Sequence, residues 1–338
     1  MLDFINSLGI YLGLIAIILI PLIIGGLGGM FSERSGVINI ALEGIMIFGG
    51  FAGILVTNQF ALFKMIGAPA NNYFVGLMVF ILGTIVAGIV GAIVSALHAF
   101  ASVSMKADQT ISATAINLIA PALLPFMIQT LKLGEQDKLN IINREYFYVP
   151  NVVFGNYDGA NIPFIGKFLT GNLYFSLILG VIIIIIAAIV INKTKIGLRI
   201  KAAGENPHAL DTAGVDPRKM RYLGVIISGF LAGIAGFFLI TGFTNRFESN
   251  VSGYGFLALA VLIFGNWKPG GIILGGLLFS ALLTLSNAIA LFPFLAGLNI
   301  PSTVLKILPY LITLLVLVLT SKKSHAPQNE GIFYEKIR

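Results

Sequence analysis

Residues 172–192 read NLYFSLILGVIIIIIAAIVIN, a run with no charged side chain that is long enough to cross a lipid bilayer as a helix. Similar runs recur along the chain of 338 residues, of which 57% are hydrophobic and only 10% are charged. A soluble domain carries about 25% charged residues, so this chain has too few to cover the surface of a globule in water. The sequence therefore predicts an all-α, multi-pass membrane protein.

Nine apolar stretches are candidate membrane spans, because a span needs about 20 mainly apolar residues. The stretch 254–267 is too short for a straight span, so it is either re-entrant or continues across Pro269 into its neighbour. The stretch 73–100 is long enough to be tilted or broken. We expect a transmembrane bundle of about 8–10 helices over residues 1–320. The candidates are 8–30, 36–57, 73–100, 111–131, 172–192, 222–243, 254–267, 270–291 and 303–320.

The basic side chains predict which loops face the cytoplasm. Segment 193–221 has seven basic and three acidic residues, a net +4 that is the strongest basic bias in the chain. The tail 321–338 opens with Lys322 and Lys323. Both segments are predicted to be cytoplasmic, and the loop 132–170, one span before the basic segment, is predicted to be external. Counting nine spans back from a cytoplasmic tail places the N-terminus outside.

Within the basic segment, capping signals predict a short helix over residues 207–213. Asn206 is a good N-cap, Pro207 suits the first helical position and Gly214 is a natural C-terminal stop. The Asp-Pro pair that follows repeats this start and begins the next membrane helix. The pattern alone fits either an ordinary linker helix or a docking helix that transmits the motion of a partner.

Several classes of function lack their sequence signals. The chain has no cysteine, which removes disulfides, thiolate chemistry and cysteine-based metal sites. It contains no Walker A pattern, and its three histidines show no metal-ligand spacing, so we expect no catalytic residue, metal or cofactor in this chain. The net charge of +7 marks cytoplasmic loops and not a nucleic-acid surface. A stand-alone secondary transporter is an alternative, although the internal repeats and midplane ion pairs typical of that class are not evident.

Five motifs resemble, in order, those of one family of ABC-importer permeases, which serves branched-chain amino acids, simple sugars and nucleosides. They are FSERSGVINIALEGIM at 31–46, KADQTISATAIN at 106–117, GLRIKAAGENPHALDTAG at 197–214, RYLGVIISGFLAG at 221–233 and the stretch 258–269. The resemblance covers nearly the whole chain, and the first motif is most like that of the bacterial nucleoside-uptake branch. Ribose and galactose permeases share a looser form of it, so a simple-sugar permease is the nearest alternative.

The resemblance implies a type II importer fold and a transport subunit of the cytoplasmic membrane, with ATP and Mg²⁺ held by a separate ATPase. The implied partners are cytoplasmic ATPase subunits, a second permease subunit in a heterodimer or homodimer, and an external substrate-binding lipoprotein. The third motif resembles the coupling loop that binds the ATPase. Its matching positions are Gly197, Arg199, Ala203, Gly204, Glu205, Asn206, Pro207, His208 and Ala209.

Polar residues in or near the predicted spans are candidates for the substrate pathway. Asn39 and Glu43 lie four apart and would share one helix face, with Glu43 about 10 Å into the membrane. Glu43 either lines the pathway or is held against a neighbouring helix through Arg34 or a backbone amide. The candidates are Asn39, Glu43, Asn117, Asn245 and Asn266.

Two further pairs of residues lie where spans are expected to end. Glu33 and Arg34 are predicted to pair either with each other or with a partner subunit. Trp267, followed by Lys268, resembles an interfacial anchor, because tryptophan and lysine are common at the membrane boundary.

Overall fold

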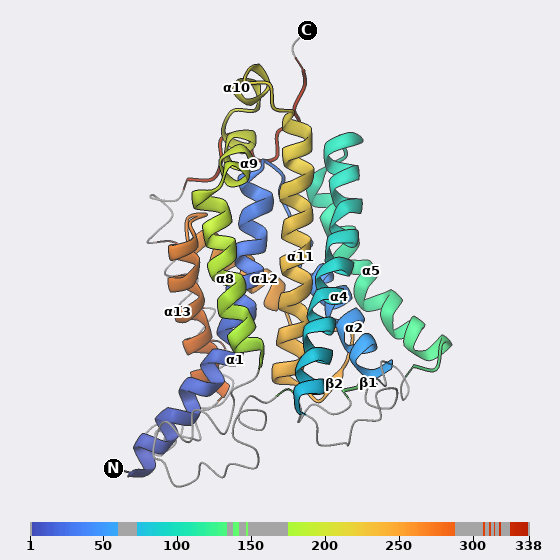
Figure 1. Ribbon diagram of the computed structural model, residues 1–338, viewed down its shortest axis with the longest axis vertical. Helices are drawn as coiled ribbons and strands as arrows, with labels where there is room; N and C mark the ends of the chain where they lie inside the picture. Colours follow the sequence, from blue (N-terminus) through green and yellow to red (C-terminus); the bar gives the residue numbers. More distant parts are fainter. Residues whose placement is uncertain are drawn as a thin grey trace.

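The chain folds into a bundle of apolar helices, seen from the side in Figure 1. Five helices are long and apolar enough to cross a membrane: α1 (Leu2–Arg34), α4 (Tyr73–Ala99, continued by the π-helix η1, Phe100–Ser104), α5 (Gln109–Thr130), α8 (Phe175–Lys193) and α11 (Pro217–Phe243). Three more apolar helices are shorter: α2 (Leu42–Gln59), α12 (Tyr254–Phe264) and α13 (Pro269–Asn287). This computed structural model describes residues 2–59, 73–133, 138–141, 147, 175–287, 307, 311, 314, 318 and 325–336.

The predicted all-α bundle is confirmed, and these eight helices fall within the expected range. The predicted span 303–320 lies outside the described residues except at four single positions, and most of the predicted external loop 132–170 lies outside them too.

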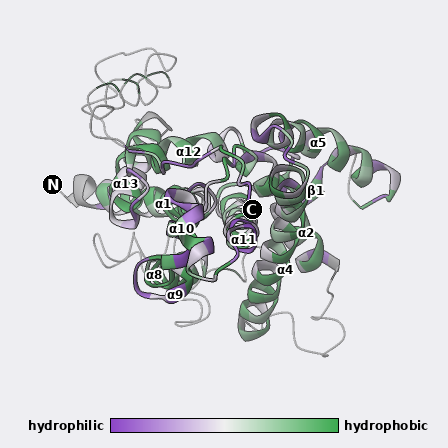
Figure 2. Cartoon of the chain, turned by 90° about the horizontal axis from the view of Figure 1, so that it is seen from above, coloured by the Kyte–Doolittle hydropathy of each residue, from purple (hydrophilic) through white to green (hydrophobic). Residues whose placement is uncertain are grey.

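Helix α11 forms the centre of the bundle and packs against α1, α2 and α4 (Figure 2). Every residue from Leu231 to Gly242 is buried. At Gly233, a Cβ atom would contact the backbone of Ala87 and Gly91 in α4, and a Cβ atom at Gly49 in α2 would contact the backbone of Gly233. Since lipid tails are as apolar as leucine, helices in a membrane associate through such close backbone approach. The small residues of α11 therefore position three helices at once.

Two helices begin inside the bundle, where the sequence predicts longer spans. The predicted span 36–57 is helical only from Leu42, because residues 37–41 form an irregular turn. The predicted segment 254–267 forms α12, whose 11 residues cover about 16 Å, roughly half of a bilayer core. It does not continue into α13, because Asn266 and Trp267 have positive φ angles and turn the chain.

The two ends of the bundle differ in composition. At one end β1 (Leu139–Asn140) pairs antiparallel with β2 (Arg246–Phe247). At the other lie α9 (Lys195–Glu205), α10 (Pro207–Thr212) and the C-terminal segment, defined as residues 325–336. We call this second end the basic end; its hydrophilic colouring contrasts with the apolar bundle in Figure 2. The start of α1 lies at the end opposite to the basic end (Figure 1).

Candidate functional site

Two short helices, α9 and α10, connect α8 to α11 at the basic end; we call them the α9–α10 element. Thr194 caps α9 by accepting a hydrogen bond from the Gly197 amide at 3.2 Å. Asn206 ends α9 and caps α10, accepting from the Ala209 amide at 3.0 Å. The predicted short helix is confirmed as α10. The structure adds α9, for which the capping residue Thr194 is the available sequence signal.

The nine positions of the coupling-loop motif divide between two sides of this element. Gly204 is buried against α1, where a Cβ atom would contact the carbonyl oxygen of Arg34. Such positions fix the element on the bundle, whereas exposed ones are accessible to a partner. Gly197, Ala203, Gly204 and Pro207 are buried, Glu205 is half-buried, and Arg199, Asn206, His208 and Ala209 are exposed.

The end of α1 is bound to this element and to the turn between α12 and α13. Arg34 places Nη1 3.2 Å from Glu205 Oε1 and donates through Nε to the Trp267 carbonyl at 3.2 Å. Glu33 accepts a hydrogen bond from Trp267 Nε1 at 2.5 Å. Glu33 and Arg34 therefore do not pair with each other. Trp267 is only 7% exposed, so its prediction as an interfacial anchor is wrong: its indole binds a buried carboxylate instead.

The C-terminal segment lies across the same contact. The Asn329 amide donates to the Gly204 carbonyl at 2.8 Å, and its side chain donates to the Glu205 carbonyl at 2.7 Å. From α11, the buried Arg221 donates to a backbone carbonyl of the segment at 2.6 Å. The sequence predicts only a cytoplasmic tail here, because partners more than 100 residues apart leave no local signal.

Glu330 lies in this segment beside the end of α1. Burial raises the pKa of its carboxyl group to about 7, and hydrogen bonding to Glu33 with the positive charge of Arg34 offsets part of that rise. One carboxyl oxygen of Glu330 is buried without a donor among the described residues. Protonation of Glu330 is therefore linked to that of Glu33, with which it shares a hydrogen bond.

Three of the predicted pathway residues meet where α2 begins. Glu43 accepts hydrogen bonds from the Gly253 and Gly255 amides at 2.8 and 2.7 Å, at the N-terminus of α12. A carboxylate is favourable there because of the helix dipole and the unpaired amides. The geometry matches the expectation that a backbone amide of a neighbouring helix holds Glu43.

Asn39 and Asn117 hold the irregular turn before α2. Asn39 donates to Ser228 Oγ at 2.9 Å, and it does not share a helix face with Glu43 because it precedes the helix. Asn117 of α5 donates to the Ile40 carbonyl at 2.9 Å and accepts from the Gly44 amide at 2.8 Å. Both asparagines thus fix the position at which the chain enters α2.

Asn245 and Asn266 lie apart from this cluster. Asn245 precedes β2, where its carbonyl accepts from the Ile141 amide at 3.0 Å. Asn266 lies at the basic end, where its side chain accepts from the His325 amide at 2.9 Å. The structure therefore brings three of the five predicted pathway residues together and separates the other two.

The fold and the site together define the class of protein. It is a multi-pass membrane protein in which α2 and α12 begin inside the bundle, and such interrupted helices are typical of transporters. Comparison with known proteins gives the family. The profile described as branched-chain amino acid transport system / permease component matches residues 11–319. The chain belongs to this family of permeases, whose members are transport subunits of the cytoplasmic membrane and not enzymes.

The chain is similar to several curated proteins over most of its length. It is 35% identical to the nucleoside ABC transporter permease protein NupC of Lactococcus lactis, over 98% of each chain. It is also 35% identical to the guanosine ABC transporter permease protein NupQ of Bacillus subtilis, over 99% of each chain. A putative glucose ABC transporter permease protein of Haloferax volcanii is 31% identical, over 77% of this chain and 72% of its own. No solved structure matches the chain significantly.

Proposed function

We propose that this chain is the permease subunit of an ATP-driven ABC importer that moves nucleosides across the cytoplasmic membrane. The observation that carries the proposal is the 35% identity, over 98% and 99% of the chain, to permeases named for nucleosides and guanosine. A simple-sugar permease is the second candidate, supported by 31% identity over 77% of the chain to the putative glucose permease. The longer and closer match favours nucleosides.

The α9–α10 element is the proposed docking site for a cytoplasmic ATPase, which holds the ATP and Mg²⁺. Its exposed face carries Arg199, His208 and Ala209. Behind this face, the ion pair between Arg34 and Glu205 joins the element to α1. A displacement of the docked element is therefore passed directly to a membrane helix.

Entry of substrate is assigned to the region where α2 and α12 begin inside the bundle. Glu43 links the two helix starts through the Gly253 and Gly255 amides. We assign to Glu43, Asn39 and Asn117 the role of holding this junction, so that a shift of α1 and α2 reaches the pathway. A second permease subunit and an external substrate-binding lipoprotein complete the proposed transporter.

Uptake in cells tests the substrate. We expect labelled uridine or guanosine uptake to require this chain, and excess unlabelled nucleoside to suppress it while equal excess ribose does not. Suppression by ribose with no effect of any nucleoside would establish the sugar permease instead. Transport by the purified chain in vesicles without any ATPase would establish a secondary transporter.

Substitutions on the exposed face test the docking site. Ala209→Arg adds a long cation to that face, so we expect at least about a tenfold loss of uptake with an unchanged amount of protein in the membrane. The exposed Lys219→Gln is the matched control and should keep its uptake. Normal uptake by Ala209→Arg would refute the docking assignment. Gly204→Asp is unsuitable, because its side chain would contact α1 and disturb the fold.

A further inference from the structure

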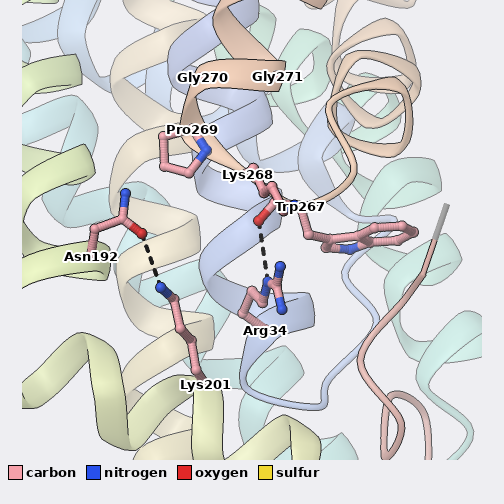
Figure 3. Close-up of a pocket in the computed structure, with 8 residues that line it drawn as sticks. All are labelled: Arg34, Asn192, Lys201, Trp267, Lys268, Pro269, Gly270 and Gly271. Atoms are coloured by element: carbon pink, nitrogen blue, oxygen red, sulfur yellow. Dashed lines mark hydrogen bonds between the residues drawn. The ribbon is translucent and has the colours of Figure 1, made fainter. Parts of the chain in front are cut away.

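A pocket of about 460 Å³ opens at the basic end, between the ends of α1 and α8, helix α9 and the start of α13 (Figure 3). It does not include the exposed docking positions of α9 and α10. Its lining residues are Arg34, Asn192, Lys201, Trp267, Lys268, Pro269, Gly270 and Gly271.

The described lining of the pocket is basic. Among the described residues that line it, three side chains are cations, Arg34, Lys201 and Lys268, and none is acidic. Arg34 has Glu205 as a counter-ion and also lies near Glu330, whereas among the described residues Lys201 donates only to the neutral Asn192 side chain, at 2.9 Å (Figure 3). Burial and the nearby Arg34 lower the pKa of Lys201. An anion in the pocket would relieve this repulsion.

Backbone geometry adds to the positive potential. Helix α13 has 19 residues and begins at Pro269, so the positive end of its dipole faces the pocket. Gly270 leaves the mouth open, since a Cβ atom there would meet no atom within 4 Å. The pocket thus combines three cations, a helix start and an accessible entrance.

The apolar surfaces beside the pocket indicate the source of the anion. Helices α8 and α13, which both reach the pocket, present exposed aliphatic side chains further along the membrane. They are Ile182, Ile185 and Ile189 on α8, and Leu274 and Leu277 on α13. An anionic headgroup with apolar chains attached fits this combination, because basic pockets between membrane helices on the cytoplasmic side recognise anionic lipids.

We propose that this pocket binds the phosphate headgroup of an anionic phospholipid from the cytoplasmic leaflet, with the acyl chains along α8 and α13. The lipid would bridge α1, α9 and α13, and so stabilise the contact that carries the α9–α10 element. The proposal does not depend on which substrate the permease moves.

Lipid titration of the full-length protein, purified in neutral detergent with the subunits that copurify, tests the proposal. We expect phosphatidylglycerol to raise the melting temperature, with little effect of phosphatidylcholine. Each lysine near an anionic lipid contributes about a fivefold change in affinity, so Lys201→Gln with Lys268→Gln should raise the half-saturating concentration about 25-fold. The matched control is Lys195→Gln with Lys219→Gln, two exposed lysines outside the pocket.

A second pair of variants separates the effect of charge on lipid binding from an effect of the substitution on folding. Gly270→Glu places a carboxylate at the mouth of the pocket, where the helix start tolerates an acid. Gly270→Gln adds a side chain of the same size without charge. We expect the glutamate variant to lose the response to phosphatidylglycerol and the glutamine variant to retain most of it.

The outcomes separate lipid from other sources. An equal response to both lipids, or an equal response of the wild type and the pocket double variant, overturns the proposal. Millimolar inorganic phosphate that reproduces the full effect overturns the lipid assignment in favour of a free phosphate. Selective loss in the pocket double variant and in Gly270→Glu supports the lipid site.

Discussion

In the membrane bundle, α2, α4 and α11 approach one another through glycines, whereas at the basic end α1, α9 and the C-terminal segment meet through directional polar contacts. At Gly233 three backbones converge with no room for a side chain. At the basic end, Arg34, Arg221 and Asn329 donate to defined oxygens on other segments. The first kind of contact tolerates almost no change of volume, and the second depends on charge and hydrogen-bond geometry. A protein with this division can keep a rigid bundle while its basic end responds to partners or pH.

Breaking the glycine contact should have the largest effect. Gly233→Val places side-chain atoms where the α4 backbone lies at Ala87 and Gly91, so we expect a loss of about 3 kcal/mol or more in folding stability. The measurement is the fraction of monodisperse protein in detergent gel filtration. Gly270→Ala is the control, because its new methyl group meets open space. A Gly233→Val variant with normal yield would show that the bundle is loosely packed.

Removing the Arg221 guanidinium should release the C-terminal segment and leave the bundle folded. Hydrogen bonds from charged donors contribute about 1.5–3 kcal/mol, so Arg221→Met should weaken the attachment of the segment by about 2 kcal/mol. The chain has no cysteine, so a single cysteine at Lys336 gives a unique spin label whose mobility reports this release. Lys219→Met on the same helix should leave the label unchanged. An immobile label in Arg221→Met would mean that the other contacts of the C-terminal segment are enough to hold it on the bundle.

The smallest effect should be a pH dependence carried by Glu330. Its pKa is about 7 in the folded protein and near 4.5 when exposed, so the folded form binds more protons between these values. Stability of the segment therefore falls as pH rises through this window, as linkage requires. We expect the Lys336 label to be more mobile at pH 8 than at pH 6. Glu330→Gln, which cannot ionise, should reduce this difference, and any smaller response that remains is assigned to Glu33, to which Glu330 is hydrogen-bonded. A difference of unchanged size in Glu330→Gln would assign the pH response to another group.

Much of the fold follows from local sequence. Each described helix of the bundle overlaps a predicted span, and Asn206 and Pro207 mark the start of α10 within one segment of chain. The late start of α2 is not predictable from hydropathy, because residues 37–41 are as apolar as the helix that follows and are held instead by Asn39 and Asn117.

The candidate site could be predicted from the sequence only in part. The coupling-loop motif can be identified in the sequence, but the sequence does not say which of its positions are exposed. That depends on the packing of Gly204 against α1. The pathway candidates illustrate the same limit, since Asn245 and Asn266 have the same chemistry as Asn117 and lie elsewhere. The type of a side chain is given by the sequence, whereas the residues that it contacts depend on the fold.

The sequence by itself determined that this chain lies in a membrane, where most of its helices fall and which segment is most basic, because hydropathy, caps and charge act over a few residues. Only the tertiary structure decided that Trp267 binds Glu33, that the C-terminal segment lies across Gly204, and that Arg34, Lys201 and Lys268 share one pocket. These contacts join residues far apart in the chain, so they form only when the packed bundle brings the ends of α1, α9 and α13 and the C-terminal segment together.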